Sequence, residues 1–295
     1  MTDSTDTLIH ITDLHFWEVV KNPFALMNKR FLGNANVFYR RRKEFHMGQA
    51  AAYSAHLAKL GISECLIGGD FTSTATPREY EMGRAFTDDL VRRGMRVHVM
   101  PGNHDVYTFE SHRARRFESY FGDYAPSGGY PHATALPGGT PLILVPTVCP
   151  NFLSSAGRIS NTEATQVRRM IEACPAGPVL VAGHYPVLHK TAGYTSGRSR
   201  QLRNAEALRA AMGETGRDIL YLAGHVHRFS YTQDAGYPGL RHLTTGAFFL
   251  KRPTEICRGA FSTIQVAGGQ FHVAWHTFDQ DWETVDAEVA AVPPL

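Results

Sequence analysis

Carboxylate, amide and imidazole side chains follow five apolar segments of this 295-residue sequence. In chain order, Asp13 and His15 follow TLIHIT, and Asp70 follows ECLIG. Asn103 and His104 follow RVHVM, His184 follows PVLVA, and His225 and His227 follow ILYLA. These residue types bind divalent metals, and imidazole is also the usual carrier of protons near neutral pH. Each alone also has ordinary structural roles, such as a turn or a helix cap. Five in succession, mostly beside a glycine, favour one shared site.

The apolar segments are predicted to be buried strands of an α/β protein. Each is rich in Val, Ile, Leu or Cys and ends at a break, and PLILVPTV at 141–148 adds a sixth. Apolar residues at helical spacing lie between them, at 44–60, 77–93, 160–174 and 202–212. Ligand sites of α/β sheets form where loops converge at the carboxyl ends of strands. We therefore expect the polar residues to meet at that edge.

The i, i+2 spacing within two pairs of these residues also indicates a shared metal site. In an extended segment, residues i and i+2 project to the same side. Asp13 and His15 are then able to reach one metal from one strand end. His225 and His227 do the same if their strand continues that far.

The last part of the chain has a different pattern. Segments at 240–250, 260–269 and 270–278 are strand-like with no helical pattern between them, which predicts successive antiparallel strands. Residues 124–140 are a Gly/Pro-rich loop, and no repeat or linker divides the sequence. We therefore expect a single domain over residues 1–295.

The ordered series DLH, GGD, GNHD, GHYP and GHVH resembles the calcineurin-like metallophosphoesterases, whose pattern is DxH, GD, GNH[D/E], GH and GHxH. The resemblance spans residues 13–227 and is closest to the bacterial phosphodiesterase branch. It implies a four-layer αββα sandwich of two mixed β-sheets flanked by helices. It also implies a centre of two divalent metal ions at the carboxyl ends of the strands.

The resemblance also implies a role for each residue in the motifs. Asp13, His15 and His227 would bind one metal, Asp70 would bridge both, and Asn103, His184 and His225 would complete the second. His104 would bind no metal and would act on the substrate. Nitrogen and oxygen ligands without a thiolate suit Mn, Fe, Zn or Co, and the sequence does not choose among them.

These roles predict a metal-dependent phosphodiesterase acting on a small diester, such as a cyclic nucleotide. A hydroxide that bridges the metals would attack the phosphorus, and His104 would protonate the leaving alkoxide as a general acid. The protein phosphatases of the family extend the second motif to GDxxDRG, whereas Ser73 and Thr74 stand at the Asp and Arg positions here. This difference argues against a protein phosphatase and leaves open which group orients His104.

An inserted segment at 17–45 is basic and rich in apolar residues. It holds seven Lys or Arg against two Glu, while the whole chain has a formal net charge of only +3. It is either a packed helical hairpin with a solvated basic face, a cap over the site, or a contact with an anionic membrane. The cap and the loop at 190–203 offer as substrate contacts Arg30, Arg41, Lys190, Arg198 and Arg200.

The same segment supports an alternative function, the hydrolysis of a nucleotide-lipid pyrophosphate at the membrane surface. The UDP-diacylglucosamine pyrophosphatases of the same superfamily are an example. A catalytically inactive interaction scaffold is disfavoured, because every expected ligand and His104 are present.

Composition narrows the remaining possibilities. The small net charge gives no reason to expect nucleic acid as a partner. The four cysteines are scattered, the N-terminal MTDSTDT does not resemble a signal peptide, and no apolar run is long enough to span a membrane. We expect a cytoplasmic protein that acts on a small phosphoester, either free or peripheral to a membrane. A homo-oligomer, with the aromatic residues of 17–45 covering a neighbouring subunit, stays open.

Overall fold

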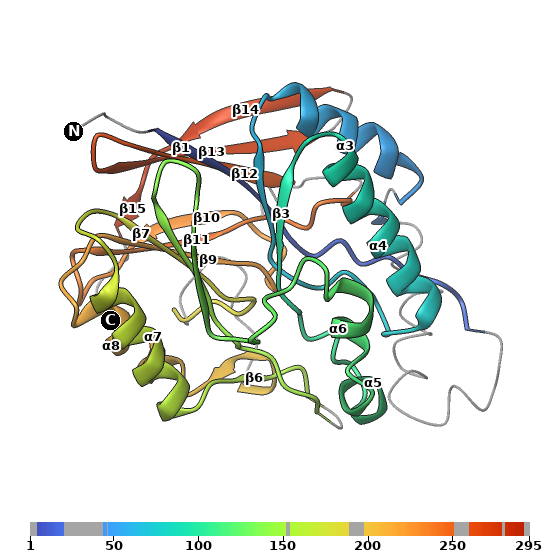
Figure 1. Ribbon diagram of the computed structural model, residues 1–295, viewed down its shortest axis with the longest axis horizontal. Coiled ribbons are helices and arrows are strands. Elements are labelled where there is room, and N and C mark those ends of the chain that lie inside the picture. Colours follow the sequence, from blue (N-terminus) through green and yellow to red (C-terminus); the bar gives the residue numbers. More distant parts are fainter. Residues whose placement is uncertain are drawn as a thin grey trace.

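Two mixed β-sheets pack face to face, and helices cover their outer faces (Figure 1). The structure is a computed structural model that describes residues 5–20, 44–45, 47–151, 154–188, 198–250, 260–278 and 281–291. This arrangement confirms the expected four-layer αββα sandwich.

The first sheet has six strands in the order β14-β13-β12-β1-β2-β3. Their bounds are Trp282–Ala287, Gln270–Phe278, Phe261–Ala267, Asp6–Ile11, Glu64–Ile67 and Arg96–Val99. The strands β1, β2 and β3 are parallel, and Ile11 pairs with Ile67, which pairs with Val99. Because these last residues are in register, the loops that follow the three strands leave the sheet side by side.

The second sheet has seven strands in the order β15-β10-β11-β9-β7-β5-β4. Their bounds are Ala290–Ala291, Ser230–Gln233, Leu240–Thr244, Ile219–Ala223, Val179–Ala182, Pro141–Leu144 and His132–Ala135. The strands β5, β7, β9 and β11 are parallel. A separate pair, β6 (Gly157–Arg158) and β8 (Leu202–Arg203), joins two of the loops beyond this sheet.

Helices flank each sheet on its outer side (Figure 1). On the first sheet these are α3 (Ala50–Lys59), α4 (Pro77–Arg92), α5 (Phe109–Arg113) and α6 (Arg116–Phe121), preceded by the 3-10 helix η3 (Met47–Gln49). On the second sheet they are α7 (Asn161–Ala173) and α8 (Ala205–Gly213), with the 3-10 helix η4 (Arg198–Arg200) before β8. Both α4 and α7 begin at a capping box, formed by Thr76 with Glu79 and by Ser160 with Glu163.

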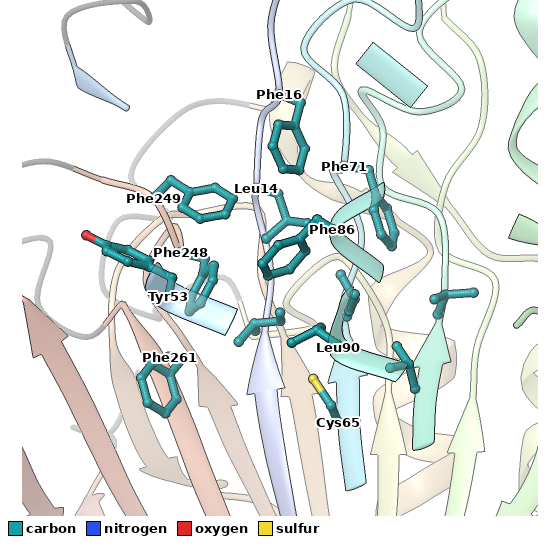
Figure 2. Packing of buried hydrophobic residues seen from close by; sticks show 14 of the residues in the cluster. Leu14, Phe16, Tyr53, Cys65, Phe71, Phe86, Leu90, Phe248, Phe249 and Phe261 are labelled. Carbon is teal, nitrogen blue, oxygen red and sulfur yellow. The ribbon is translucent and has the colours of Figure 1, made fainter. Parts of the chain in front are cut away.

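The central strands are buried on both faces. In β1, Ile9 and Ile11 pack in the cluster beneath α3 and α4, whereas Leu8 packs in the cluster between the two sheets. Burial on both sides explains why these strands are continuous apolar runs in the sequence. Figure 2 shows the helix-side cluster, in which the ring of Phe86 lies near those of Phe248 and Phe249.

Some sequence predictions differ from the structure. The helix expected over 202–212 begins at Ala205, because Leu202 and Arg203 pair with β6 instead. The strand expected from residue 240 ends at Thr244 and runs parallel to β9 in the second sheet, so the prediction of an antiparallel run was wrong there. The prediction holds for β12, β13 and β14. Of the inserted segment 17–45, residues 21–43 lie outside the described residues. None of the helices in the described ranges is long and apolar enough to cross a membrane.

Candidate metal centre

The predicted site residues leave the strand ends in tight turns. Positive φ angles occur at eight non-glycine residues of the described chain, and five of these are Asp13, His15, Asp70, His225 and His227. Such angles are uncommon outside glycine and cluster at functional sites. Because β1 and β9 end before these residues, the expectation of extended segments was wrong. The left-handed turns, rather than strand pleating, direct the side chains to the site.

Four side chains form a first ligand set. One ligand atom from each of Asp13, His15, Asp70 and His227 lies within 4.8 Å of the others. His227 Nε2 is 2.9 Å from His15 Nε2 and 3.1 Å from Asp13 Oδ1. Two ligands that bind one metal at about 2.1 Å and at right angles lie about 3.0 Å apart, so these separations fit a shared cation. Asp13 Oδ1 is buried, and the imidazole of His227 approaches it without a well-directed hydrogen bond, so a bound cation would offset the cost of burying this oxygen.

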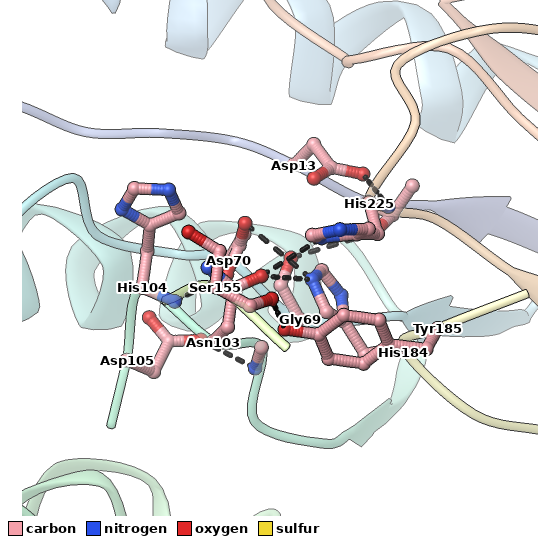
Figure 3. Close-up of polar contacts among 12 residues, drawn as sticks. Asp13, Gly69, Asp70, Asn103, His104, Asp105, Ser155, His184, Tyr185 and His225 are labelled. Carbon is pink, nitrogen blue, oxygen red and sulfur yellow. Dashed lines mark hydrogen bonds and ion pairs between the residues drawn. The ribbon is translucent and has the colours of Figure 1, made fainter. Parts of the chain in front are cut away.

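A second ligand set adjoins the first. Asn103 Oδ1 lies 3.2 Å from His184 Nε2 and 2.9 Å from His225 Nδ1. Asp70 Oδ2 lies 3.4 Å from His184 Nε2 and 3.8 Å from His15 Nε2, so this one oxygen faces both sets. Figure 3 shows Asp70 between the ring of His104 on one side and the ring of His225 on the other.

Backbone carbonyls fix the tautomers of three imidazoles. His15 Nδ1 donates to Thr72 O at 3.3 Å, His184 Nδ1 to Gly68 O at 2.9 Å, and His225 Nε2 to Arg200 O at 2.9 Å. Each bond directs the remaining ring nitrogen, with its lone pair, toward the carboxylates and Asn103. Metal-binding histidines are commonly held in this way.

The charges also suit metal binding. Burial would raise the pKa of Asp70, but His184 and His104 beside it hold that pKa well below its usual value. Burial, reinforced by His184, lowers the pKa of His225 to about 4. Burial would lower the pKa of His184, but Asp70 beside it raises that pKa to about 9, so a bound cation would have to displace this proton. An ionised carboxylate and a neutral imidazole are the forms that coordinate a cation.

His104 lies beside the two ligand sets, and a backbone carbonyl orients its ring. Its Nδ1 donates to Ser73 O at 2.6 Å, and its ring stacks on Tyr107 with centroids 5.3 Å apart. Its backbone N–H donates to Asp70 Oδ1 at 2.7 Å. Ser73, at the position where the protein phosphatases have an Asp, therefore orients His104 through its backbone carbonyl.

Asp105 is a structural member of the site that sequence reasoning missed. Its buried carboxylate accepts hydrogen bonds from Gly102 N at 2.8 Å, from Phe71 N at 3.2 Å and from Thr72 N at 2.9 Å. Burial, with a smaller contribution from Asp70, raises its pKa to about 7. Its hydrogen bonds connect the loops that carry Asp70 and His104. The sequence feature that could have identified Asp105 is its position directly after His104 in the motif GNHD.

Two glycines allow the loops to pack this closely. A Cβ on Gly102 would lie 2.2 Å from Asp70 Oδ1, and one on Gly224 would lie 2.5 Å from Asp13 Oδ2. Both separations are far below van der Waals contact. The glycines of the motifs therefore make room for the two carboxylates.

The predicted substrate contacts are only partly described. Arg30, Arg41 and Lys190 lie outside the described residues, and Arg198 is described only by its place at the start of η4. Arg200 is exposed, and its carbonyl accepts the bond from His225 described above. Near the two ends of the 17–45 segment, Glu18 N donates to Glu79 Oε1 at 3.3 Å, and Phe45 meets the ring of His15 edge-on at 5.4 Å.

A sequence model of the family described as calcineurin-like phosphoesterase matches residues 7–229, about three quarters of the chain. The chain belongs to this family. It is therefore a metal-dependent phosphoester hydrolase. No curated protein matches the sequence of this phosphoesterase.

Solved structures with the same fold have very different sequences. A dimetal phosphatase from Danio rerio superposes with a TM-score of 0.63 at 15% identity, over 95% of this phosphoesterase and 98% of that chain. PhoD superposes with a TM-score of 0.63 at 10% identity, over 96% of this phosphoesterase and 68% of the PhoD chain. The purple acid phosphatase PPD1 from yellow lupin seeds superposes with a TM-score of 0.62 at 10% identity, over 97% of this phosphoesterase and 54% of the PPD1 chain. At such low identity, these likenesses establish the fold of the phosphoesterase and nothing finer.

Proposed function

We propose that the chain is a dinuclear-metal phosphodiesterase that hydrolyses a small phosphodiester, such as a cyclic nucleotide. The observation that carries the proposal is the position of Asp70, whose Oδ2 faces both ligand sets while its Oδ1 accepts the backbone N–H of His104. A bridging carboxylate beside a histidine that binds no metal is the arrangement that this reaction requires.

Each ligand set holds one cation in this proposal. Asp13, His15 and His227 hold the first, Asn103, His184 and His225 hold the second, and Asp70 contributes to both. When bound, divalent metals supply a water of lowered pKa and offset the charge on the phosphoryl oxygens. Mn, Fe, Zn and Co all suit this mixture of nitrogen and oxygen donors.

His104 is the general acid. Because its Nδ1–H is donated to Ser73 O, the proton that it exchanges is carried on Nε2. Donation of that proton to the leaving alkoxide is worth about 10²–10⁴ in rate. The stacked ring of Tyr107 holds the imidazole plane during the transfer.

The surroundings of Thr74 support a diester rather than a monoester. Thr74 replaces the Arg of the protein phosphatases, and its backbone N–H and hydroxyl both donate to the buried carboxylate of Glu79, at 2.8 Å and 3.1 Å. This loop thus offers no positive side chain at that position for the second negative charge of a monoester. A diester carries only one negative charge, so its binding depends less on a positive side chain at this position.

Hydrolysis of two chromogenic esters tests the proposal. After metal removal, the protein is reconstituted with Mn, Fe, Zn or Co and given bis(p-nitrophenyl) phosphate or p-nitrophenyl phosphate. We expect metal-dependent turnover that favours the diester. Turnover that favours the monoester, or that does not depend on added metal, would contradict the assignment.

The second candidate is a nucleotide-lipid pyrophosphatase acting at a membrane surface. It is suggested by the basic and apolar composition of the 17–45 segment, whose last residue, Phe45, lies against His15. Liposomes of anionic lipid distinguish the two candidates. A pyrophosphatase of this kind would sediment with them and act on a lipid-linked diphosphate, whereas a soluble phosphodiesterase would do neither.

A further inference from the structure

Three exposed arginines lie on loops that adjoin the second ligand set. Several arginines elsewhere in the chain, such as Arg84 and Arg209, have carboxylate partners, at 2.7 Å and 2.6 Å. Arg158, Arg200 and Arg203 are exposed, and their guanidinium groups make no ion pair or hydrogen bond with the described residues. We call these three residues the arginine strip.

Pairing of β6 with β8 assembles the strip. Arg158 and Arg203 are partners in the parallel register, and Ile159 N donates to Arg203 O at 3.3 Å. Their neighbours Gly157 and Leu202 are buried, so the arginines occupy the outer face of the pair. The two side chains leave adjacent strands, whose backbones lie about 4.8 Å apart, and a directly opposed pair of like charges is unfavourable. A protein tolerates such a local cost mainly where it serves a function.

The strip is fixed to the candidate metal centre. Arg200 O accepts the hydrogen bond from His225 Nε2 at 2.9 Å, so this backbone is in direct contact with a member of the second ligand set. The Tyr185 ring lies 4.2 Å from the His225 ring, and its hydroxyl donates to Ser155 O in the loop before β6 (Figure 3). Both loops that carry the arginines are thus anchored at the edge of the site.

The acidic groups at the starts of α7 and α8 have other partners among the described residues. Glu163, at the start of α7, accepts hydrogen bonds from the backbone N and the hydroxyl of Ser160, at 2.7 Å and 2.6 Å. Glu206 pairs with Arg209 at 2.9 Å. The three guanidinium groups therefore stay available for an anion that comes from solution.

We propose that the arginine strip binds a second phosphoryl group of the substrate, while the scissile phosphate lies at the metal centre. This inference rests on the proposed function and narrows it to phosphoesters or phosphoanhydrides that carry a further phosphate. Guanidinium is the side chain best matched to phosphate, because its planar fork donates two parallel hydrogen bonds. A substrate with a single phosphate, such as a simple cyclic nucleotide, leaves the strip unused.

Calorimetric binding to the metal-reconstituted full chain tests the subsite without requiring turnover. The probes are thymidine 5′-monophosphate and thymidine 3′,5′-bisphosphate at one ionic strength. We expect the wild type to bind the bisphosphate at least about tenfold more tightly. In the combined variant Arg158→Gln, Arg200→Gln, Arg203→Gln, the ratio of the two affinities should fall toward one. Circular dichroism and metal content of the variant establish that it is folded and loaded.

Arg169→Gln is the matched control. Arg169 is exposed on the third turn of α7, so this variant also loses positive charge while leaving the strip intact. It should keep the tenfold preference. Equal affinities in the wild type, or a preference that survives in the combined variant, would overturn the subsite.

Turnover of the p-nitrophenyl 5′-esters of thymidine 5′-phosphate, with and without a 3′-phosphate, separates the two proposals. If neither ester is hydrolysed while the binding preference persists, the proposed phosphodiesterase function fails and the subsite stands. If both are hydrolysed at equal kcat/KM and the wild type binds both nucleotides equally, the function stands and the subsite is rejected.

Discussion

The two oxygens of Asp70 have different partners, and this division defines the site at the scale of single residues. Oδ2 faces His15 and His184, one from each ligand set, while Oδ1 accepts the N–H of His104. The carboxylate is buried and ionised, since its pKa is held well below the usual value by the histidines around it. A single side chain thus joins the metal sites to the residue proposed as general acid.

Replacement of that carboxylate should disable both metal sites. We expect Asp70→Ala to lose turnover and to bind less than the wild-type amount of metal, because each ligand set loses its shared member. Elemental analysis of the purified variant, alongside the chromogenic assay, measures both effects. Full metal content together with unaltered turnover would rule out the bridging assignment.

His104 should behave differently from the ligands. His104→Ala is expected to retain metal while losing about 10²–10⁴ in rate, because only proton donation is removed. The loss should be greatest for esters whose leaving group is a poor one, and smallest for p-nitrophenolate, which needs little protonation. A variant that loses metal instead would make His104 a ligand and reverse its assigned role.

At the scale of elements, the sequence predicted the strands better than the loops between them. The central strands are apolar on both faces because both faces are buried, and they can therefore be recognised in the sequence as continuous apolar runs. The pairing of β8 with β6 cannot be recognised in this way, since it joins residues 45 positions apart, as in Gly157 with Leu202. The contact that orients His104 is a backbone carbonyl, which every residue possesses, so no motif could have revealed it.

Glu79, in the first turn of α4, provides a test of stability against pH. Burial raises the pKa of Glu79 to about 7 from 4.5, although hydrogen bonds from Thr74, Thr76 and Glu18 oppose the shift. The native state then binds this proton more tightly than the unfolded state does. The free energy of unfolding therefore falls as pH rises from about 4.5 to 7, with a contribution on the order of 3 kcal/mol from this group.

Urea denaturation at a series of pH values measures this contribution. Relative to the wild type, Glu79→Gln should lack that part of the decline, because an amide does not titrate in this range. Glu81→Gln, a change on the exposed side of the same helix, should keep the wild-type pH dependence. Parallel curves for the wild type and Glu79→Gln would show that Glu79 titrates alike in both states.

At the scale of the whole molecule, the candidate ligands come from both sheets. Asp13, His15, Asp70 and Asn103 follow strands of the first sheet, whereas His184, His225 and His227 follow strands of the second. The two sheets otherwise meet through an apolar cluster that includes Leu8, Leu66, Leu180 and Leu220. Metal ions bound at this edge would link the two halves of the sandwich directly.

Bound metal should therefore stabilise the entire fold as well as enable turnover. A ligand present at a hundred times its Kd and bound only by the native state adds about 2.7 kcal/mol, which raises the Tm of a protein of this size by about 5 °C. Thermal unfolding of the chelator-treated protein, with and without added Mn, measures the shift.

His184→Ala should reduce the shift in Tm, because the variant lacks a ligand from the second sheet. His272→Ala, an exposed change on β13, should keep the wild-type shift. A Tm that does not respond to metal in the wild type would mean that the two sheets are held without the ions, and that the ligand sets do not form the link between them.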